Sequence, residues 1–116
     1  MFNFVKQKPE LPTFTQKGLD GFQFPLENKE LEVYYVDSHE GHDNFVVSQT
    51  ILHVYYVLEG KGYFIINDKR FDVSTGMAVE IPVGAEFAYT GSMKMLLMIT
   101  PPFSPEEVGE TRSNLR

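Results

Sequence analysis

Short apolar and alternating segments, separated by turn-forming residues, recur along the chain. They are rich in valine, isoleucine, leucine, methionine, tyrosine and phenylalanine, most of which fit the pleated surface of a sheet. Glycine, proline, asparagine and serine gather between them. These expected strands are 31–36, 45–50, 70–73, 77–81, 86–90 and 93–99. Since no segment of ten or more residues has a helical period, the pattern predicts an all-β domain: a sandwich, a jelly roll or a barrel.

The segment from Leu52 to Ile66 is the most β-rich stretch of the chain. Residues 59–62, Glu-Gly-Lys-Gly, interrupt it and supply the permissive backbone that a tight reversal needs. We therefore expect a β-hairpin here, at the centre of the fold, with His53 near the start of its first strand.

The two ends of the chain differ from this centre. Residues 1–30 hold prolines and glycines between short apolar groups, which predicts an extended arm. Because its phenylalanines are too apolar to be surrounded by water, the arm should pack on a sheet edge or on a second copy, and we expect a homodimer. Residues 31–100 should form the barrel. Residues 101–116 should be a surface tail with one helical turn at 105–107.

Length and charge narrow the class of protein. A chain of 116 residues suffices for one domain with one core. A formal net charge of -6 disfavours nucleic acid or an anionic membrane as a partner. With no cysteine there are no disulfides, thiolate metal sites or cysteine nucleophiles. No apolar run is long enough for a signal peptide or a membrane span, so we expect a cytoplasmic protein.

Five backbone-shaping residues recur at fixed spacing: Gly41, Gly60, Gly76, Pro82 and Gly84. The corners of a small barrel need backbone angles that most residues resist, which gives glycine and proline a mechanical role there. In this spacing the chain resembles the cupin superfamily over residues 31–100. The resemblance implies a cupin-type double-stranded β-helix, which is a jelly-roll barrel.

The cupin motifs also specify metal ligands, namely two histidines, a glutamate and a third histidine. At those four positions this sequence has Val47, Gln49, His53 and Phe87. Valine and phenylalanine have no lone pair to donate, and an amide is a poor ligand for Fe, Mn, Ni or Zn. We therefore expect neither a metal nor another cofactor at the inherited site.

The resemblance also indicates which side chains face the lumen. If His53 points inward as the glutamate of the family does, strand alternation turns the side chains two positions away inward as well. The resulting lumen is aromatic and mildly polar, and we expect it to bind a small organic molecule. The expected lining residues are Val47, Gln49, His53, Tyr55, Phe87 and Tyr89.

His53 is the candidate general base, because an imidazole titrates near neutrality. Tyr55 or Tyr89 could return a proton to the other face of a substrate carbon. Metal-free sugar epimerases and isomerases among cupins are similar in using histidine and tyrosine. The alternative is that His53 has a structural role only, as a buried side chain that is hydrogen-bonded to a neighbour.

Three functions remain open at this point. The first is a cupin that binds a small molecule without catalysis. The second is a metal-independent isomerase, epimerase or lyase that uses His53 and a tyrosine. The third is a metal-dependent dioxygenase with non-standard ligands.

The segment from His39 to Asp43 contains two further histidines. Gly41 lies between them, and the surrounding turn formers indicate a solvated loop and not a helix whose face could hold zinc. A metal held by His39, His42 and His53 at the mouth of the barrel is the alternative.

Overall fold

The structure is a computed structural model that describes residues 2–104 and 108–115. Within these residues the regular elements are all β-strands, so the prediction of an all-β fold is confirmed. No helix in this part of the chain is long and apolar enough to cross a membrane. The strands are β1 (Phe14–Gln16), β2 (Leu19–Gln23), β3 (Glu32–Ser38), β4 (Asn44–Ser48), β5 (Leu52–Ile66), β6 (Lys69–Ser74), β7 (Ala78–Ile81), β8 (Phe87–Thr100) and β9 (Val108–Ser113).

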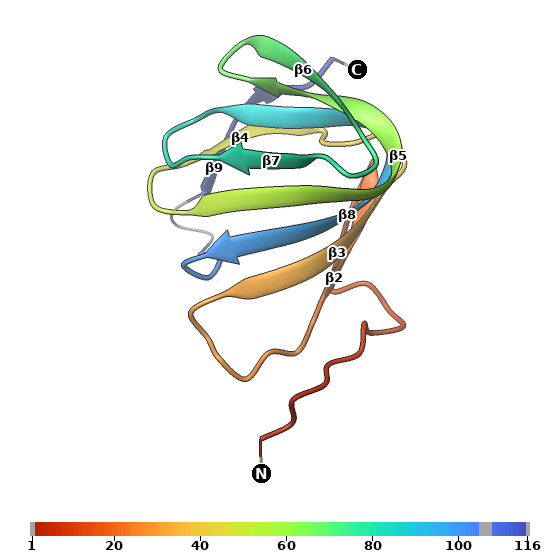
Figure 1. Cartoon of the computed structure of the whole chain (residues 1–116). Helices are drawn as coiled ribbons and strands as arrows, with labels where there is room; N and C mark the ends of the chain where they lie inside the picture. The colour runs from red at the N-terminus through yellow and green to blue at the C-terminus, as the bar shows by residue number, and fades with distance from the viewer. Residues whose placement is uncertain (1, 105–107, 116) are drawn as a thin grey trace.

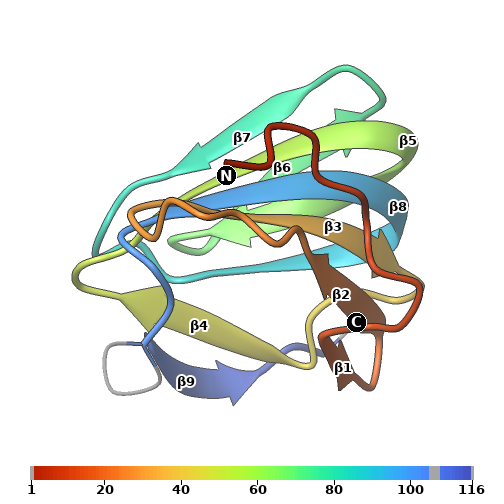
Figure 2. The ribbon, with the colours of Figure 1, turned by 90° about the horizontal axis from the view of Figure 1, so that it is seen from below.

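Two long antiparallel strands, β5 and β8, run through both halves of the barrel (Figure 1). In one half, β7 pairs with β5, and β3, β2 and β1 continue the sheet from β8. In the other half, β6 pairs with β5, and β8 meets β4, which pairs with β9. Seen from below, β4 and β9 face β3 and β8 across the lumen (Figure 2). This arrangement is a curled jelly-roll barrel.

The hairpin predicted at residues 59–62 is wrong, because β5 is one continuous strand. The glycines let β5 bend together with β8 instead of reversing the chain. A Cβ on Gly62 would lie 2.3 Å from the carbonyl oxygen of Thr90, and a Cβ on Gly91 would lie 2.7 Å from Cα of Gly62. The two backbones therefore approach more closely at the bend than side chains would allow.

The same bend joins two segments that the sequence separates. Residues 86–90 and 93–99 were expected as different strands, but Phe87–Thr100 is the single strand β8. Other predicted turns are present. Asn67 and Asp68, with φ of 49° and 65°, connect β5 to β6.

The ends of the chain take part in the barrel. The arm contributes β1 and β2, and β2 pairs with β3 from Leu19↔Ser38 to Gln23↔Tyr34. Residues 108–113, expected within a surface tail, form β9, pair with β4 and are mostly exposed. The helical turn predicted at 105–107 lies outside the described residues.

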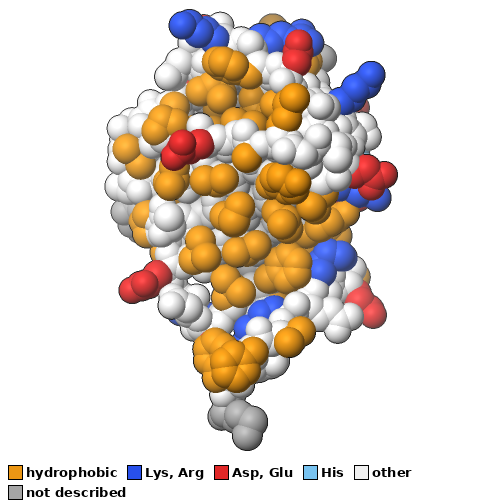
Figure 3. Space-filling model, viewed as in Figure 1, with side chains coloured by type: hydrophobic (Ala, Val, Ile, Leu, Met, Phe, Trp, Pro, Cys, Tyr) orange, Lys and Arg blue, Asp and Glu red, His pale blue; other side chains and the backbone are white. Residues whose placement is uncertain are grey.

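The core lies inside the barrel, where alternate residues of the strands point. Val57, Phe64, Phe87 and Met95 are buried there. The outer face of β3, β8, β5 and β7 is also apolar, as the space-filling view shows (Figure 3). Tyr56 on this face is 38% exposed. Large apolar side chains therefore cover both sides of this sheet.

Candidate functional site

A cavity of about 440 Å³ lies inside the barrel, between its two halves. Most of its wall is aromatic or aliphatic, and its polar groups are hydroxyls, one amide and two imidazoles. The described residues that line it are Phe14, Thr15, Gln16, Leu19, Tyr34, Val36, His42, Val46, His53, Tyr55, Phe87, Tyr89, Leu97, Ile99 and Phe103. Such a small, apolar hollow with a few convergent polar groups is typical of a ligand site.

Sheet register explains why His53 and Tyr55 face this lumen. His53 pairs with Ile99, and Tyr55 pairs with Leu97 and lies two residues further along β5. Side chains two residues apart point to the same face of a strand, so both rows project inward. Four of the residues that the sequence proposes for the site, His53, Tyr55, Phe87 and Tyr89, are brought together here.

Val47 and Gln49 are placed differently from the sequence prediction. Val46 lines the cavity and Val47 does not, while Gln49 is exposed. Val46 pairs with Phe87 of the cavity wall, and Ser48, two residues further along β4, is 4% exposed. The strand alternates regularly here, so the positions assigned from the cupin motif are one residue away from those that point inward.

His42 is a cavity residue that the sequence reasoning assigned to a solvated loop, and this was wrong. The side chain is 8% exposed. Its ring centroid lies 4.1 Å from that of Tyr89 and 5.4 Å from that of Phe87. His39, three residues earlier, is exposed and lies 3.3 Å from a carboxylate oxygen of Asp20. The two histidines therefore occupy quite different surroundings.

Gly41 allows His42 to reach this position. It has a φ of +105°, and a Cβ added to it would lie 2.2 Å from the carbonyl oxygen of Tyr89. Only glycine fits both restrictions. The backbone N–H of His42 then donates to the same carbonyl at 2.9 Å. The feature of the sequence that could have indicated this placement is the first glycine of the cupin motif, Gly41, followed directly by a histidine.

The C-terminal segment holds the other side of the His42 backbone. The Asn114 side-chain amide is buried and donates to the carbonyl of His42 at 3.0 Å and to the hydroxyl of Thr90 at 3.2 Å. The backbone N–H of Asn114 donates to the carbonyl of Asp43 at 2.8 Å. Residues from three distant parts of the sequence thus fix the imidazole at the lumen.

Tyr55 and Tyr89 form an aromatic group beside His42. Their ring centroids are 5.4 Å apart and lie edge to face. Burial raises the pKa of both phenols well above the usual value. Both hydroxyls therefore stay protonated at neutral pH and can donate hydrogen bonds, although burial makes them weaker acids than a solvated tyrosine.

His53 also packs against Phe87, with 5.1 Å between ring centroids. Burial lowers the pKa of His53 to about 4, and a hydrogen bond to the backbone of Ile51 opposes this only in part. The imidazole is therefore neutral at physiological pH. Its environment makes it a much weaker base than a solvated histidine.

The metal that cupins commonly hold does not fit these residues. Among the described residues, no three histidine, aspartate or glutamate side chains lie close enough together to ligate one ion. His39 points to Asp20 outside the lumen, while His42 and His53 are both packed against Phe87.

Comparison with known proteins agrees with this architecture. No family model and no curated protein matches the sequence. The Y55F variant of Streptomyces Pac13, solved with uridine, has a TM-score of 0.89 over 97% of this chain and 93% of its own, at 22% identity. KdgF from Halomonas has a TM-score of 0.70 over 82% and 89%, at 12% identity. The cupin domain of Schizosaccharomyces pombe Cnp3 has a TM-score of 0.65 over 73% and 66%, at 16% identity.

These similarities show that the chain has the fold of a small cupin barrel, so the fold expected from the cupin resemblance is confirmed. The H42Q and Y89F variants of Pac13 were also solved with uridine. A further structure describes Pac13 as a nucleoside dehydratase, with a TM-score of 0.83 and 21% identity to this chain.

Proposed function

We propose that this cupin-fold barrel binds a nucleoside-sized molecule in its lumen and eliminates water from it. The observation that carries the proposal is that His42, Tyr55 and Tyr89 line one cavity. The Pac13 variants solved with uridine alter a histidine at 42 and tyrosines at 55 and 89, and this chain has the same residue types at the same numbers. Water elimination is a lyase reaction, one of the activities that the sequence left open.

The chemistry of the lumen restricts the substrate. An imidazole removes a proton from carbon readily only when a neighbouring carbonyl stabilises the resulting negative charge. A hydroxyl β to that carbonyl can then leave. A uridine oxidised to the aldehyde at C5′ or to the ketone at C3′ has this arrangement. We therefore expect a nucleoside with a β-hydroxy carbonyl group on its sugar.

In the proposed reaction His42 is the general base and a tyrosine is the general acid. The imidazole takes the proton from the carbon between the carbonyl and the C–OH group. The C–O bond breaks, and Tyr55 or Tyr89 donates its proton to the departing oxygen, so that water and a conjugated carbonyl product form. The proton on His42 then returns to the phenolate. No electrons are exchanged with another reactant.

His42 is preferred to His53 as the base because its ring lies 4.1 Å from the ring of Tyr89, a candidate acid, and because a histidine at 42 was altered in a Pac13 variant solved with uridine. The lowered pKa of His53, about 4, makes that imidazole a weak proton acceptor. His53 remains the second candidate, with its ring facing the same lumen. Ligand binding without turnover is the second candidate function, supported by the same cavity.

The test uses purified full-length protein. Calorimetry with uridine measures binding, and incubation with 5′- or 3′-oxidised uridine measures formation of the conjugated product by its ultraviolet absorption and by the loss of one water in the mass spectrum. Binding with product formation supports the dehydratase, and binding without product supports the non-catalytic function. Absence of binding to uridine and to both oxidised forms would refute the proposal.

The variants H42Q and H53Q show which histidine is the general base, because turnover should be lost only when the histidine that removes the proton is replaced. Elemental analysis of protein purified without chelators tests the metal-dependent alternative. Near-stoichiometric Fe, Mn, Ni or Zn would favour it over the mechanism proposed here.

A further inference from the structure

The lumen has no lysine or arginine to offer an anionic ligand, among the described residues that line it. Its hydrogen-bonding groups are the hydroxyls of Thr15 and the tyrosines, the amide of Gln16 and two imidazoles, of which His53 is kept neutral by burial. Phosphates in proteins are usually held by arginine, lysine or helix N-termini, and the described residues form no helix. A neutral sugar and base can be bound here, but a phosphate would be desolvated without a partner.

A carboxylate stands at the edge of this lumen. Glu32 is the first residue of β3 and lies on the inner face, two residues before Tyr34, and it pairs with Ile99 of the cavity wall. Its Oε1 accepts the hydroxyl of Tyr34 at 3.1 Å and the backbone N–H of Phe103 at 3.0 Å. Both donors belong to residues that line the cavity, and Phe103 is 50% exposed, so this is where the lumen meets solvent.

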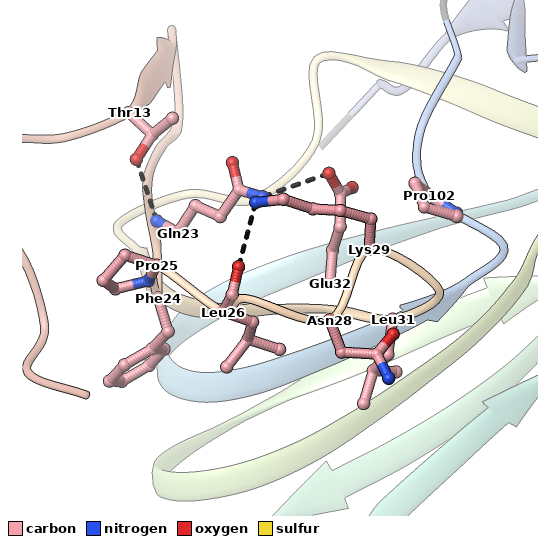
Figure 4. Close-up of a pocket in the computed structure, with 10 residues that line it drawn as sticks. All are labelled: Thr13, Gln23, Phe24, Pro25, Leu26, Asn28, Lys29, Leu31, Glu32 and Pro102. Atoms are coloured by element: carbon pink, nitrogen blue, oxygen red, sulfur yellow. Dashed lines mark hydrogen bonds between the residues drawn. The ribbon is translucent and has the colours of Figure 1, made fainter. Parts of the chain in front are cut away.

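The second oxygen of Glu32 faces a neighbouring surface depression (Figure 4). There Oε2 accepts the side-chain amide of Gln23 at 3.0 Å. Lys29 lines the same depression, but its ammonium donates to the carbonyl of Leu26 at 2.9 Å. No salt bridge joins Lys29 to Glu32 among the described residues, so the charge of Glu32 is held by neutral donors and is not cancelled by a direct ion pair.

We propose that Glu32 is a specificity-determining residue of this site. Its negative charge at the mouth, next to a lumen whose described lining holds no lysine or arginine, repels anionic ligands, so that the barrel accepts nucleosides and rejects nucleoside phosphates. Its hydrogen bonds to Tyr34 and Phe103 keep the charge at the mouth. This inference rests on the function proposed above, and it adds the charge class of the ligand and the residue that selects it.

The effect should be electrostatic in origin. A like charge placed against an anionic ligand excludes it even where the shape of the site would admit it. The Coulomb contribution of Glu32 should weaken as ionic strength rises, because the mouth is accessible to salt. Raising the salt concentration therefore tests the charge without changing the protein.

The experiment compares the affinity of the full chain for uridine and for uridine 5′-monophosphate by calorimetry at low and high salt. We expect the Kd of the monophosphate to be about tenfold or more above the Kd of uridine. This ratio of the two Kd values should fall as the salt concentration rises. In E32Q, whose amide can still accept the bonds from Tyr34 and Phe103, the ratio should fall further. E30Q, which removes an exposed charge two residues away, is the matched control and should retain the wild-type ratio.

Equal or tighter binding of the monophosphate to the wild-type protein would overturn this inference while leaving the dehydratase proposal intact. An unchanged ratio in folded E32Q would show that Glu32 is not the selecting residue. If E32Q does not fold, a wild-type ratio that is insensitive to salt is the result that overturns it. Failure of the barrel to bind uridine or its oxidised forms would remove the proposed function and this inference together.

Discussion

The imidazole of His42 lies against the phenol ring of Tyr89, with 4.1 Å between centroids and 42° between planes. This contact joins a loop residue to an inward-facing side chain near the start of β8. It places a base beside a phenol that is protonated at neutral pH, and burial raises the pKa of Tyr89 further. The proposed elimination needs this combination within one cavity.

Replacing His42 with glutamine should abolish most of the proposed turnover. A general base contributes about 10²- to 10⁴-fold to a rate, so kcat with oxidised uridine should fall by roughly that factor. The Kd for uridine should change little, because glutamine keeps a polar group of similar size. His39→Gln is the control, since His39 is exposed and lies outside the lumen. Undiminished kcat in His42→Gln would assign the base to another residue.

Replacing Gly41 with alanine should destabilise the fold more than the same change at Gly76. Both glycines have positive φ, +105° and +92°, but an added Cβ meets the Tyr89 carbonyl only at Gly41 and meets nothing within 4 Å at Gly76. We expect a loss of about 1–2 kcal/mol in the free energy of unfolding at Gly76 from φ strain alone. At Gly41 we expect about 3 kcal/mol or more, because the clash adds to the strain.

Urea denaturation of both variants measures this difference. Gly109→Ala is the third arm, because Gly109 has neither a positive φ nor a close neighbour and should change stability by less than about 0.5 kcal/mol. Equal losses at positions 41 and 76 would mean that the approach of Gly41 to the β8 backbone is not restrictive.

Stability should depend on pH through His53. Burial lowers the pKa of this imidazole from 6.5 to about 4 in the folded protein, so between these values the unfolded chain binds a proton that the folded chain does not. Stability therefore falls as the pH drops from 6.5 towards 4, and His53 adds no further loss below that. The maximum slope is about 1.4 kcal/mol per pH unit, and the total loss about 3 kcal/mol.

The measurement is the free energy of unfolding of wild type and His53→Gln at several pH values from 7.5 to about 4. Above pH 7 the difference between the two proteins should be constant, and below 6.5 it should shift in favour of the variant. A difference that stays constant throughout would show that His53 is not held neutral by burial.

The homodimer expected from the N-terminal arm remains a proposal. Phe4 is 84% exposed and Phe2 is 51% exposed, and the arm runs out beyond β3 (Figure 1). Solvent-exposed aromatic residues of this kind mark a contact surface. Light scattering at micromolar concentration should give the mass of two chains.

Replacing Phe2 and Phe4 together with serine should shift the protein towards monomer. Phe71→Ser is the control, because Phe71 is similarly exposed, at 47%, but lies on β6 at the other end of the molecule. A monomeric mass for the wild-type protein would refute the dimer.

The sequence by itself determined the class of fold. Strand-forming segments and the glycines and prolines between them act locally, because each turn depends on the backbone freedom of a few residues. Gly76 and Gly84 do adopt the positive φ that barrel corners need. Alternation along β5 likewise sufficed to place His53 and Tyr55 on one face, since that strand is regular there.

Only the tertiary structure decided what the glycines of β5 do and which histidine reaches Tyr89. Considered alone, Gly62 indicates a turn. In the structure β5 only bends there, where Gly91 of β8 approaches Gly62. His42 looks like a loop residue until Tyr89 and Asn114, distant in the sequence, fix its backbone over the lumen. Contacts between distant segments have no signature in a local pattern, because the same local sequence is compatible with either arrangement until its partner is in place.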